Sequence, residues 1–326
     1  MKTSWEAWNG CGVEVVLGFL WLAAMFDVSS GLYLPRRRAT ICNGRSELCG
    51  RSYGSTSFLT SHNAFAWSPN PLALARTQAV DVPVQLRMGA RVLQAQSHMK
   101  DGRLHFCHTS KHIFGLFDGG SVLDFLRKVK TWLDANPYEV VSFIFTNPEN
   151  VSIPGVWKPI FDEAGITPLA YVPPARPMKR TDWPTLSEMI DANKRVVVFM
   201  DKGADGSAGG VVDFVLPQFQ MIWEDPFSPT DPNFPCRIHR IEGPLEDNDH
   251  MHLINHNLNR NIIPWDLGTV LVSDFVNSPK TNSMNSIMAH VAGCAPFAQG
   301  RAPNFVLLDY LDVGDGKRAV DQLNGF

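Results

Sequence analysis

Short apolar runs alternate with amphipathic stretches along the chain beyond residue 50, and this alternation constrains the fold more than any other feature. The runs predict eight strands, at 57–61, 90–96, 103–108, 139–146, 195–201, 219–224, 269–275 and 304–310. The amphipathic stretches predict helices at 72–88, 121–135, 155–164, 185–194, 248–260, 283–292 and 316–324. Eight strands with helical spacers are typical of a TIM (β/α)8 barrel. We therefore expect an α/β protein with a single TIM barrel, made irregular by a spacer at 97–102 that is too short for a helix.

Nearly every predicted strand ends on a side chain that donates, accepts or transfers a proton. In chain order these strand-end residues are His62, Gln94 and Gln96, His108, Asn147, Asp201, Glu224, Asp274 and Asp309. Because the carboxyl ends of barrel strands form the active-site rim, we expect these side chains to surround one site. For any single position the alternative, that a polar residue merely marks the start of a loop, stays open.

The alternation of side chains along a strand predicts which of these residues face the barrel interior. Gln94 and Gln96 are two residues apart and share one face of their strand, whereas Arg91 falls on the opposite face, toward the helices. His108 and Asp309 each share a face with the apolar residue two positions before them. We therefore expect the glutamines, His108 and Asp309 to point toward the same interior.

Two histidines at the ends of separate strands are suited to concerted acid–base catalysis, because imidazole changes its charge near neutral pH. One of His62 and His108 then removes a proton from a nucleophilic hydroxyl while the other protonates the leaving oxygen. Transfer at a phosphodiester fits this arrangement, particularly when a neighbouring hydroxyl of the substrate attacks phosphorus. A carboxylate such as Asp309 or Asp274 is expected to orient one imidazole and stabilise its charged form.

Several segments resemble a known family. They are CNGRSELCGRSYGSTSFLTSHNAFA, GARVLQAQSH, LHFCHTS, WLDANPYEVVSFIFTN, VVVFMDKGAD and DPNFPC. In this order they resemble the secreted fungal branch of the phosphatidylinositol-specific phospholipase C-like (X-domain) phosphodiesterases. The resemblance runs from Cys42 to the C-terminus, so it implies one phosphodiesterase domain over 42–326.

The resemblance implies a distorted TIM barrel in which two histidines cleave a phosphodiester through a cyclic phosphate. His62 matches the family's first histidine, which implies the role of base, and His108 matches the second, which implies the acid for the leaving group. The implied substrate is a phosphoinositide-like or GPI-like phospholipid. Asp309 is expected to orient a histidine, with Asp274 as the less favoured candidate.

The chain departs from the family at charged positions. Asn63 follows His62 where bacterial members have an aspartate, and Gln94 and Gln96 stand where relatives have metal ligands or an aspartate and an arginine. Glutamine donates hydrogen bonds to a phosphoryl oxygen but carries no charge, so weaker stabilisation of the transition state is expected. A calcium site needs several oxygen ligands, usually carboxylates, so we expect no metal and no cofactor.

The remaining strand-end acids complete the expected site. Gln94 and Gln96 are expected to contact the phosphoryl group, and Asn63, Asp201, Glu224 and Asp274 to line the rest of the substrate pocket.

Two alternatives to this enzyme stay open. One is a catalytically weak or inactive barrel that binds an inositol phosphate, a lipid headgroup or a glycan, and the missing charge on the second strand motivates it. The other is a related barrel diesterase acting on glycerophosphodiesters or sphingolipids. Those enzymes use acidic metal ligands that the sequence does not show, so the second alternative is less favoured.

The N-terminus and the cysteines indicate export. The apolar run at 13–26 fits the core of a signal peptide within residues 1–31 and is too short to span a bilayer comfortably; a signal anchor, a mis-assigned start and a buried segment are the alternatives. Cys42 and Cys49 bracket a short loop that a disulfide closes, and Cys236 and Cys294 form the next plausible pair. Cys107 has no obvious partner, and the sequon at Asn150 accepts a glycan in a secreted chain. We therefore expect a secreted, extracellular protein.

Charge and composition restrict the partners. With a net charge of -3 and scattered Lys and Arg residues, nothing indicates nucleic-acid binding. We expect a monomer with a phospholipid-type substrate, and peripheral membrane contact stays open because Trp223 and Phe227 either touch a lipid interface or pack beneath their loop. His252 and His256 have the spacing of metal ligands on a helix, but no third ligand is evident, so a solvated start of a helix is favoured.

Overall fold

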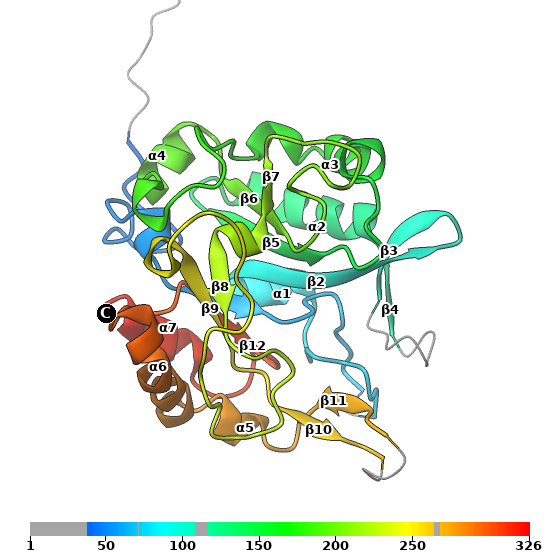
Figure 1. Cartoon of the computed structure of the whole chain (residues 1–326), viewed down its shortest axis with the longest axis vertical. Helices are drawn as coiled ribbons and strands as arrows, with labels where there is room; N and C mark the ends of the chain where they lie inside the picture. The colour runs from blue at the N-terminus through cyan, green and yellow to red at the C-terminus, as the bar shows by residue number, and fades with distance from the viewer. Residues whose placement is uncertain (1–37, 71, 108–116, 264–267) are drawn as a thin grey trace, which may run out of the picture. The chain divides into compact units, whose positions relative to one another are not determined.

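The structure is a computed structural model that describes residues 38–70, 72–107, 117–263 and 268–326 (Figure 1). The expected signal peptide (1–31) and His108 lie outside the described residues. No helix in the described part of the chain is long and apolar enough to cross a membrane.

Eight parallel strands form one curled sheet that is hydrogen-bonded in the order β7-β6-β5-β2-β1-β12-β9-β8 (Figure 1). They are β1 (Phe58–Ser61), β2 (Ala90–Lys100), β5 (Val141–Thr146), β6 (Val196–Met200), β7 (Val215–Pro217), β8 (Ile222–Glu224), β9 (Met251–Asn255) and β12 (Phe305–Leu308). In chain order these strands run once around a barrel, which confirms the expected irregular TIM barrel. No ladder joins β7 to β8 within the described ranges, so the barrel is open along one seam.

Two of the eight predicted strands do not belong to the barrel. The strand predicted at 103–108 is β3 (Arg103–Cys107), which pairs antiparallel with β2 and continues into β4 (Asp118–Ser121). Asp101 and Gly102 both have positive φ and close a tight hairpin between β2 and β3, which is why no helix fits there. The strand predicted at 269–275 is β11 (Leu271–Ser273), which pairs only with β10 (Asn259–Asn261) in a separate two-stranded sheet.

The other two strands of the barrel are β7 and β9. The helix predicted at 248–260 is wrong, because β9 occupies this segment. All five residues of β9, Met251–Asn255, are buried. A parallel barrel strand is covered on both faces, so its polar residues do not mark a solvent side. His252 is one of these polar residues, and its ring stacks on buried Trp223 with 4.7 Å between centroids. Periodicity alone therefore indicated a helix where the chain forms a strand.

Seven α-helices accompany the sheet within the described ranges. They are α1 (Val82–Arg87), α2 (Val122–Ala135), α3 (Lys158–Glu163), α4 (Leu186–Asp191), α5 (Ser278–Thr281), α6 (Met284–Ala298) and α7 (Gly316–Leu323). The helix predicted at 72–88 begins only at Val82, because Asp81 caps it by accepting a hydrogen bond from the Val84 N–H. The predicted helix at 121–135 is α2, which begins at the N-cap Ser121.

Strand alternation separates the apolar residues into two layers. Residues such as Val92, Ile144 and Leu307 belong to one buried cluster, and their chain neighbours Leu93, Phe143 and Leu308 belong to a second cluster that also contains residues of α1, α2, α6 and α7. Arg91 lies on the helix side, where its guanidinium lies over the Trp132 ring and pairs with Glu139 at 2.7 Å. The predicted outward orientation of Arg91 is therefore confirmed.

A later segment of the chain covers the open edge of β8. The Glu224 N–H donates to the Arg240 carbonyl (3.0 Å), and the Arg240 N–H donates back to the Glu224 carbonyl (3.2 Å). These groups point away from β9, because neighbouring Asp225 uses its N–H to reach Leu253 on the β9 side. The loop after β8 therefore returns to the unpaired strand edge and brings Arg240 to the carboxyl end of the barrel.

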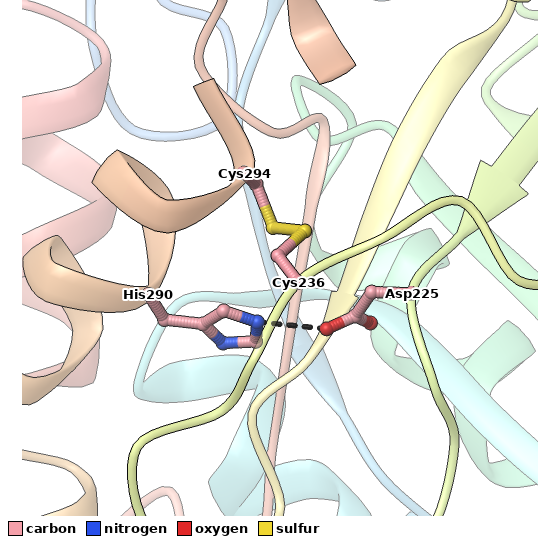
Figure 2. Close-up of side chains that lie close together, drawn as sticks. All are labelled: Asp225, Cys236, His290 and Cys294. Carbon is pink, nitrogen blue, oxygen red and sulfur yellow. Dashed lines mark hydrogen bonds and ion pairs between the residues drawn. A yellow bond between two sulfur atoms is a disulfide. The ribbon is translucent and has the colours of Figure 1, made fainter. Parts of the chain in front are cut away.

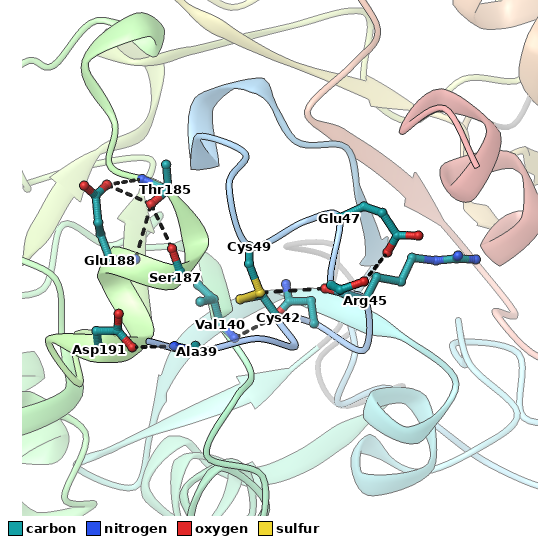
Figure 3. Close-up of a disulfide and its surroundings, with 12 residues drawn as sticks. Ala39, Cys42, Arg45, Glu47, Cys49, Val140, Thr185, Ser187, Glu188 and Asp191 are labelled. Carbon is teal, nitrogen blue, oxygen red and sulfur yellow. Dashed lines mark hydrogen bonds between the residues drawn. A yellow bond between two sulfur atoms is a disulfide. The ribbon is translucent and has the colours of Figure 1, made fainter. Parts of the chain in front are cut away.

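Both expected disulfides are present. Cys42–Cys49 closes the N-terminal loop of the described chain, beside the capped start of α4 (Figure 3). Cys236–Cys294 joins the long loop after β8 to α6 (Figure 2). Cys107 takes part in no disulfide within the described residues. Two disulfides fit an extracellular protein, because such bonds persist in oxidising compartments.

The two disulfides are expected to contribute unequally to stability. Cys236–Cys294 links residues 58 positions apart and Cys42–Cys49 residues 7 apart, so loop entropy gives about 4 and about 2 kcal/mol respectively. Replacing Cys236 and Cys294 by serine should therefore lower the free energy of unfolding by about 2 kcal/mol more than replacing Cys42 and Cys49. Urea unfolding of the two double variants measures this difference, and equal losses would contradict it.

Candidate active site

His62 directly follows β1 and is fixed by its backbone as well as by its ring. Its N–H donates to the Leu308 carbonyl of the neighbouring strand at 3.0 Å. Its own carbonyl accepts from the Thr77 hydroxyl and from the Gln78 side-chain amide, each at 3.0 Å. Thr77 and Gln78 are fully buried. The loop that contains them, which the sequence predicted as part of a helix, therefore fixes the turn after β1.

Asp309 holds the His62 ring. Its Oδ1 lies 2.7 Å from Nδ1 of His62, and its Oδ2 accepts a hydrogen bond from the Ser273 hydroxyl. Asp309 is buried, whereas the side chain of His62 is 17% exposed. A carboxylate at Nδ1 selects the tautomer that carries its proton there, which leaves the lone pair on Nε2. The pair therefore has the arrangement of a general base with its orienting carboxylate.

Asn63 connects this histidine to β2. Its side-chain amide lies 3.2 Å from Nε2 of His62, and its backbone N–H donates to Oε1 of Gln94 at 2.8 Å. Asn63 has a φ of 39°, a left-handed conformation that asparagine adopts more readily than most residues. Because the oxygen of Gln94 accepts from the backbone, its NH2 group is the part that remains to donate to a ligand.

A cavity of about 320 Å³ opens beside His62 at the carboxyl end of the barrel. Six of the residues that the sequence singled out line it: His62, Asn63, Gln94, Gln96, Asp201 and Glu224. Asp309 does not line the cavity itself but contacts His62, which does. The expected convergence of strand-end side chains is therefore observed for strands β1, β2, β6, β8 and β12.

Asp274 does not lie with these residues, which corrects its expected place in the pocket. It follows β11, outside the barrel, and lines a neighbouring cavity of about 380 Å³ with Asn277 and Lys280. Its carboxylate accepts from the Asn277 side chain at 2.7 Å, and Asp309, not Asp274, contacts His62. The misplacement follows from reading the strand at 269–275 as part of the barrel.

The far side of the cavity carries two carboxyl groups with raised pKa values. Burial raises the pKa of Asp201, although Asp201 accepts a hydrogen bond from the Asn147 N–H at 2.7 Å. Burial also raises the pKa of Glu224 to about 7, against the opposing effect of its ion pair with Arg240. Both groups therefore favour their protonated forms more than exposed carboxyl groups do.

Sequence reasoning missed several cavity residues, among them Asn255, Asn257 and Arg240. The Asn257 amide lies 3.2 Å from Nδ1 of His62, and Asn255 donates to the Asp225 carboxylate at 3.1 Å. The asparagines were missed because β9 was read as a helix; recognising a strand that ends in NHN would have found them. Arg240 follows no strand of the sheet, so no strand-end pattern indicates it.

A buried chain of histidines lies behind Asn255. Asp225 pairs with Nε2 of His290 at 2.7 Å, beside the Cys236–Cys294 disulfide (Figure 2). Nδ1 of His290 contacts Nδ1 of His256 at 2.9 Å, and Nε2 of His256 donates to the Thr281 carbonyl. Burial and the nearby His290 lower the pKa of His256 to about 3. His256 is thus held by side chains and backbone of the core.

Within the part of the chain that the structure describes, no cluster of metal-ligating side chains lies at the cavity. Among the described residues, two clusters have donor atoms close enough to share an ion. One contains Asp225 and His290, but its cysteines form a disulfide; the other is His105, Cys107 and Asp118, in which Asp118 is paired with Lys100 and His105. Neither cluster lines the cavity beside His62.

The fold and the site together define a class, an open TIM barrel with a histidine–carboxylate pair at its carboxyl end. A family model described as PI-PLC X 1 matches residues 48–324. The chain therefore belongs to the PI-PLC X family, and the resemblance inferred from sequence motifs is confirmed.

Two proteins of similar sequence support this assignment, and one solved structure shares the fold. An uncharacterized secreted protein of Arthroderma benhamiae is 39% identical over 289 residues, which cover 86% of this chain and 62% of that protein. PI-PLC X domain-containing protein 1 of the same organism is 37% identical over 321 residues, covering 94% of this chain and 97% of that protein. The solved phosphatidylinositol-specific phospholipase C from Listeria monocytogenes shares the fold, with a TM-score of 0.54 at 13% identity, over 85% of this chain and 95% of that one.

The raised pKa of Glu224 makes a prediction about stability. Below pH 4.5 the carboxyl is protonated in the folded and the unfolded chain; between pH 4.5 and 7 only the unfolded chain ionises, so folding becomes less favourable. In Glu224→Gln the side chain does not ionise, so the free energy of unfolding does not decrease for this reason. Its free energy of unfolding, relative to the wild type, should therefore rise between pH 4 and pH 8 by on the order of 3 kcal/mol.

Urea denaturation at both pH values measures this change. Glu242→Gln is the control, because it removes an exposed carboxyl from the same covering segment. If the difference between Glu224→Gln and the wild type stayed constant with pH, the raised pKa of Glu224 would be wrong.

Proposed function

We propose that this protein is a phosphoric diester hydrolase that acts on a phosphoinositide-like or GPI-like lipid through a cyclic phosphate. The observation that carries the proposal is the orientation of His62, which lines the cavity while its Nδ1 is held by buried Asp309. Membership of the PI-PLC X family supports a phospholipase C-like phosphodiesterase at the level of the reaction class.

In the proposed first step His62 acts as the base. A substrate hydroxyl next to the phosphodiester transfers its proton to Nε2 of His62, and its oxygen attacks phosphorus to form a cyclic phosphate. Asp309 stabilises the imidazolium that results. His108, outside the described residues, protonates the leaving oxygen of the lipid, and water then opens the cyclic phosphate with the two histidines in exchanged roles.

Uncharged donors are proposed to hold the phosphoryl group. The NH2 group of Gln94 is the part of its amide left for a ligand, and Gln96 and Asn63 line the same side of the cavity. Hydrogen bonds from such fixed donors stabilise negative charge that develops on phosphoryl oxygens. No step of this mechanism requires a metal ion, so we propose a metal-independent reaction.

We further propose that the protein acts outside the cell. Its two disulfides fit that location, and a relative of similar sequence is named a secreted protein. Residues 1–31 are then a cleaved signal peptide preceding the barrel domain at 42–326, and exposed Asn150 is available to carry a glycan. We propose that the protein works as a monomer.

Apolar side chains beside the site suit contact with a membrane surface. Trp67, Leu72 and Leu74 are 40%, 81% and 52% exposed on the loop after β1, and Val276 is 77% exposed just after β11. Arg76 joins the two loops, because its guanidinium lies 4.3 Å from the centroid of the Phe275 ring. Exposed apolar residues of this kind bury themselves at a lipid interface, so we propose peripheral binding through these loops.

A binding protein without turnover is the second candidate. The observation that favours it is the absence of charge at Gln94 and Gln96, where the cavity meets His62. Saturable binding of inositol phosphates with no hydrolysis at saturating substrate would favour this candidate.

Removing the catalytic groups tests the proposal. His62→Ala and His108→Ala should each lower kcat by about 10²- to 10⁴-fold, because acid–base catalysis by one positioned group contributes that much. Asp309→Asn should lower kcat by up to about 10⁴-fold, since an amide no longer selects the required tautomer. The measurement is release of cyclic inositol phosphate from phosphatidylinositol, followed by phosphorus NMR.

His105→Ala serves as the matched control, because His105 also lies on a strand but pairs with Asp118 outside the cavity. Turnover at the wild-type level in His62→Ala or His108→Ala, with His105→Ala also active, would refute the two-histidine mechanism.

The proposed independence from metal gives a separate expectation. Incubation with excess EDTA, followed by its removal, should leave kcat within about twofold of the untreated enzyme, because the described residues form no cluster of carboxylate ligands at the cavity. Added calcium should have no larger effect. A loss of activity that calcium restores would show that a metal takes part.

A further inference from the structure

Four side chains of metal-ligating types lie together in the core, apart from the cavity beside His62. They are Asp225, Cys236, His290 and Cys294, whose donor atoms lie within 4.8 Å of one another (Figure 2). The side chains of His290 and Asp225 are 0% and 3% exposed. The two cysteines are joined as a disulfide in the structure. The cluster therefore has two chemical states, one with the disulfide and one with two free thiols.

Three separate segments of the chain supply this cluster. Asp225 directly follows β8, and Cys236 lies on the loop after that strand. His290 and Cys294 are both buried on α6 and are four residues apart, a spacing that places them on the same side of the helix. An ion bound by all four side chains would therefore tie the loop after β8 to α6, as the disulfide does.

Hydrogen bonds orient the ring of His290 toward this cluster. Nε2 of His256 lies 2.7 Å from the Thr281 carbonyl, which only accepts, so this nitrogen carries a proton. In a neutral His256 the lone pair is then on Nδ1, and Nδ1 of His290, 2.9 Å away, donates to it. Nε2 of His290 faces Asp225 at 2.7 Å, so a second proton lies between that nitrogen and the carboxylate. Histidines that bind metals have the same arrangement, in which one ring nitrogen donates to a neighbour and the other binds the ion.

The carboxylate of Asp225 is oriented in a similar way. Its Oδ1 accepts hydrogen bonds from the N–H of Asn255 at 2.7 Å and from the side-chain amide of Asn255 at 3.1 Å. Its Oδ2 faces His290. The buried ring of Phe234 stacks on the His290 ring with 5.0 Å between centroids, which covers the cluster with an apolar group. Fixed neighbours and a dry environment of this kind hold metal ligands in place.

The types of donor atom select zinc. Two thiolates, an imidazole and a carboxylate are zinc ligands, with bonds of about 2.0–2.3 Å in a tetrahedron. Such bonds place the ligand atoms about 3.3–3.8 Å from one another. Donor atoms that already lie within 4.8 Å of one another need only small shifts to reach this geometry. Copper(I) favours a set of sulfur ligands, and iron–sulfur clusters usually take four cysteines, so this mixed set fits zinc better than either.

We propose that Asp225, Cys236, His290 and Cys294 bind one zinc ion when the Cys236–Cys294 disulfide is reduced. A phosphine reductant and one water molecule convert the disulfide to two thiols, and the phosphine becomes its oxide. Zn²⁺ then replaces the two thiol protons and the proton between His290 and Asp225, so three protons are released per ion. The disulfide and the zinc ion are thus alternative links between the loop and α6.

The oxidised protein differs in this respect from the reduced one. Its bonded sulfurs leave only His290 and Asp225 as ligands, too few for a tetrahedral zinc site. The expected insensitivity of turnover to EDTA concerns the oxidised protein, so it is compatible with the zinc site. The inference goes beyond the proposed function and does not depend on it.

The first test compares zinc binding by the reduced and the oxidised protein. The protein is reduced with a phosphine without oxygen, the phosphine is removed, and Zn²⁺ is titrated in competition with a chromophoric chelator. The reduced wild type should bind one ion at this site at least about 100-fold more tightly than the oxidised wild type, because two thiolates become available. Titration with Co²⁺ should give thiolate-to-metal charge-transfer absorption only after reduction.

Variants assign the ion to this cluster. Replacing both Cys236 and Cys294 by serine should weaken zinc binding by the reduced protein by about 100-fold or more, since even groups that only orient a ligand contribute roughly 10- to 100-fold. The matched control replaces the other disulfide, Cys42–Cys49, by two serines and should bind zinc as the reduced wild type does. Cys107→Ser is a second control, because Cys107 belongs to the other cluster of potential ligands.

Thermal unfolding separates a folded site from binding by an unfolded chain. Saturating zinc should raise the Tm of the reduced wild type by about 5 °C or more and leave the Tm of the oxidised protein unchanged, because only the reduced folded state binds the ion. Asp225→Asn should reduce this rise, whereas zinc bound by thiols of an unfolded chain would not depend on Asp225.

Three results would overturn the proposal. They are a folded, reduced wild type that binds no zinc, wild-type affinity in the variant without Cys236 and Cys294, and a reduced chain that unfolds and does not refold with zinc. The proposed function is tested separately, by hydrolysis with the oxidised protein. Its failure would leave the zinc site standing, and loss of the zinc site would leave the enzyme assignment standing.

Discussion

The parallel pairing of β12, β1 and β2 is the constraint on which the site depends. Ser61 pairs with Leu308 on one side and with Leu93 on the other. The next residues of the three strands are therefore His62, Asp309 and Gln94, and they meet at the same edge of the sheet. A slip of one residue in either ladder would turn the partner side chain to the opposite face, away from His62. The apolar residues that alternate between the barrel interior and the helix layer fix this register, so core packing and the site geometry have one origin.

The open seam accounts for the charge at the other side of the cavity. In a closed barrel both edges of β8 would be paired with strands, and the backbone of Glu224 would have no room for Arg240. Here the loop after β8 returns to that edge, and the Cys236–Cys294 disulfide ties the same loop to α6. Arg240 thus supplies positive charge from a loop, whereas Gln94 and Gln96 supply only neutral donors from β2. The irregularity of the barrel and the chemistry of its cavity are linked through this segment.

The sequence predicted the barrel, the disulfides and the convergence of most strand-end residues, and its errors have physical causes. His62 and Glu224 lie at the ends of strands with clear apolar patterns, and Gln94 lies within β2, so their placement followed from pattern and parity alone. Strand β9 was missed because a barrel strand is buried on both faces, and a buried His252 then resembles the polar side of a helix. Asp274 was misplaced because β11 pairs outside the barrel, a fact of tertiary pairing that local periodicity does not encode. The position of Arg240 depends on the loop after β8, which returns to the edge of that strand. No spacing of residues in the sequence indicates this return.

The distribution of charge bears on how such a site would divide binding from catalysis. Around His62 the donors are neutral amides, and the described carboxylate that contacts the ring, Asp309, is used to orient it. Neutral donors hold a phosphoryl oxygen but bind the substrate's anion less tightly than a cation does. They therefore lower the free energy of the bound substrate only slightly relative to the transition state. The guanidinium of Arg240 pairs instead with the carboxyl group of Glu224. In the proposed reaction, binding energy gained away from the scissile bond would be available to position the phosphodiester against His62, so that a cavity with a weakly charged reaction centre would still support turnover.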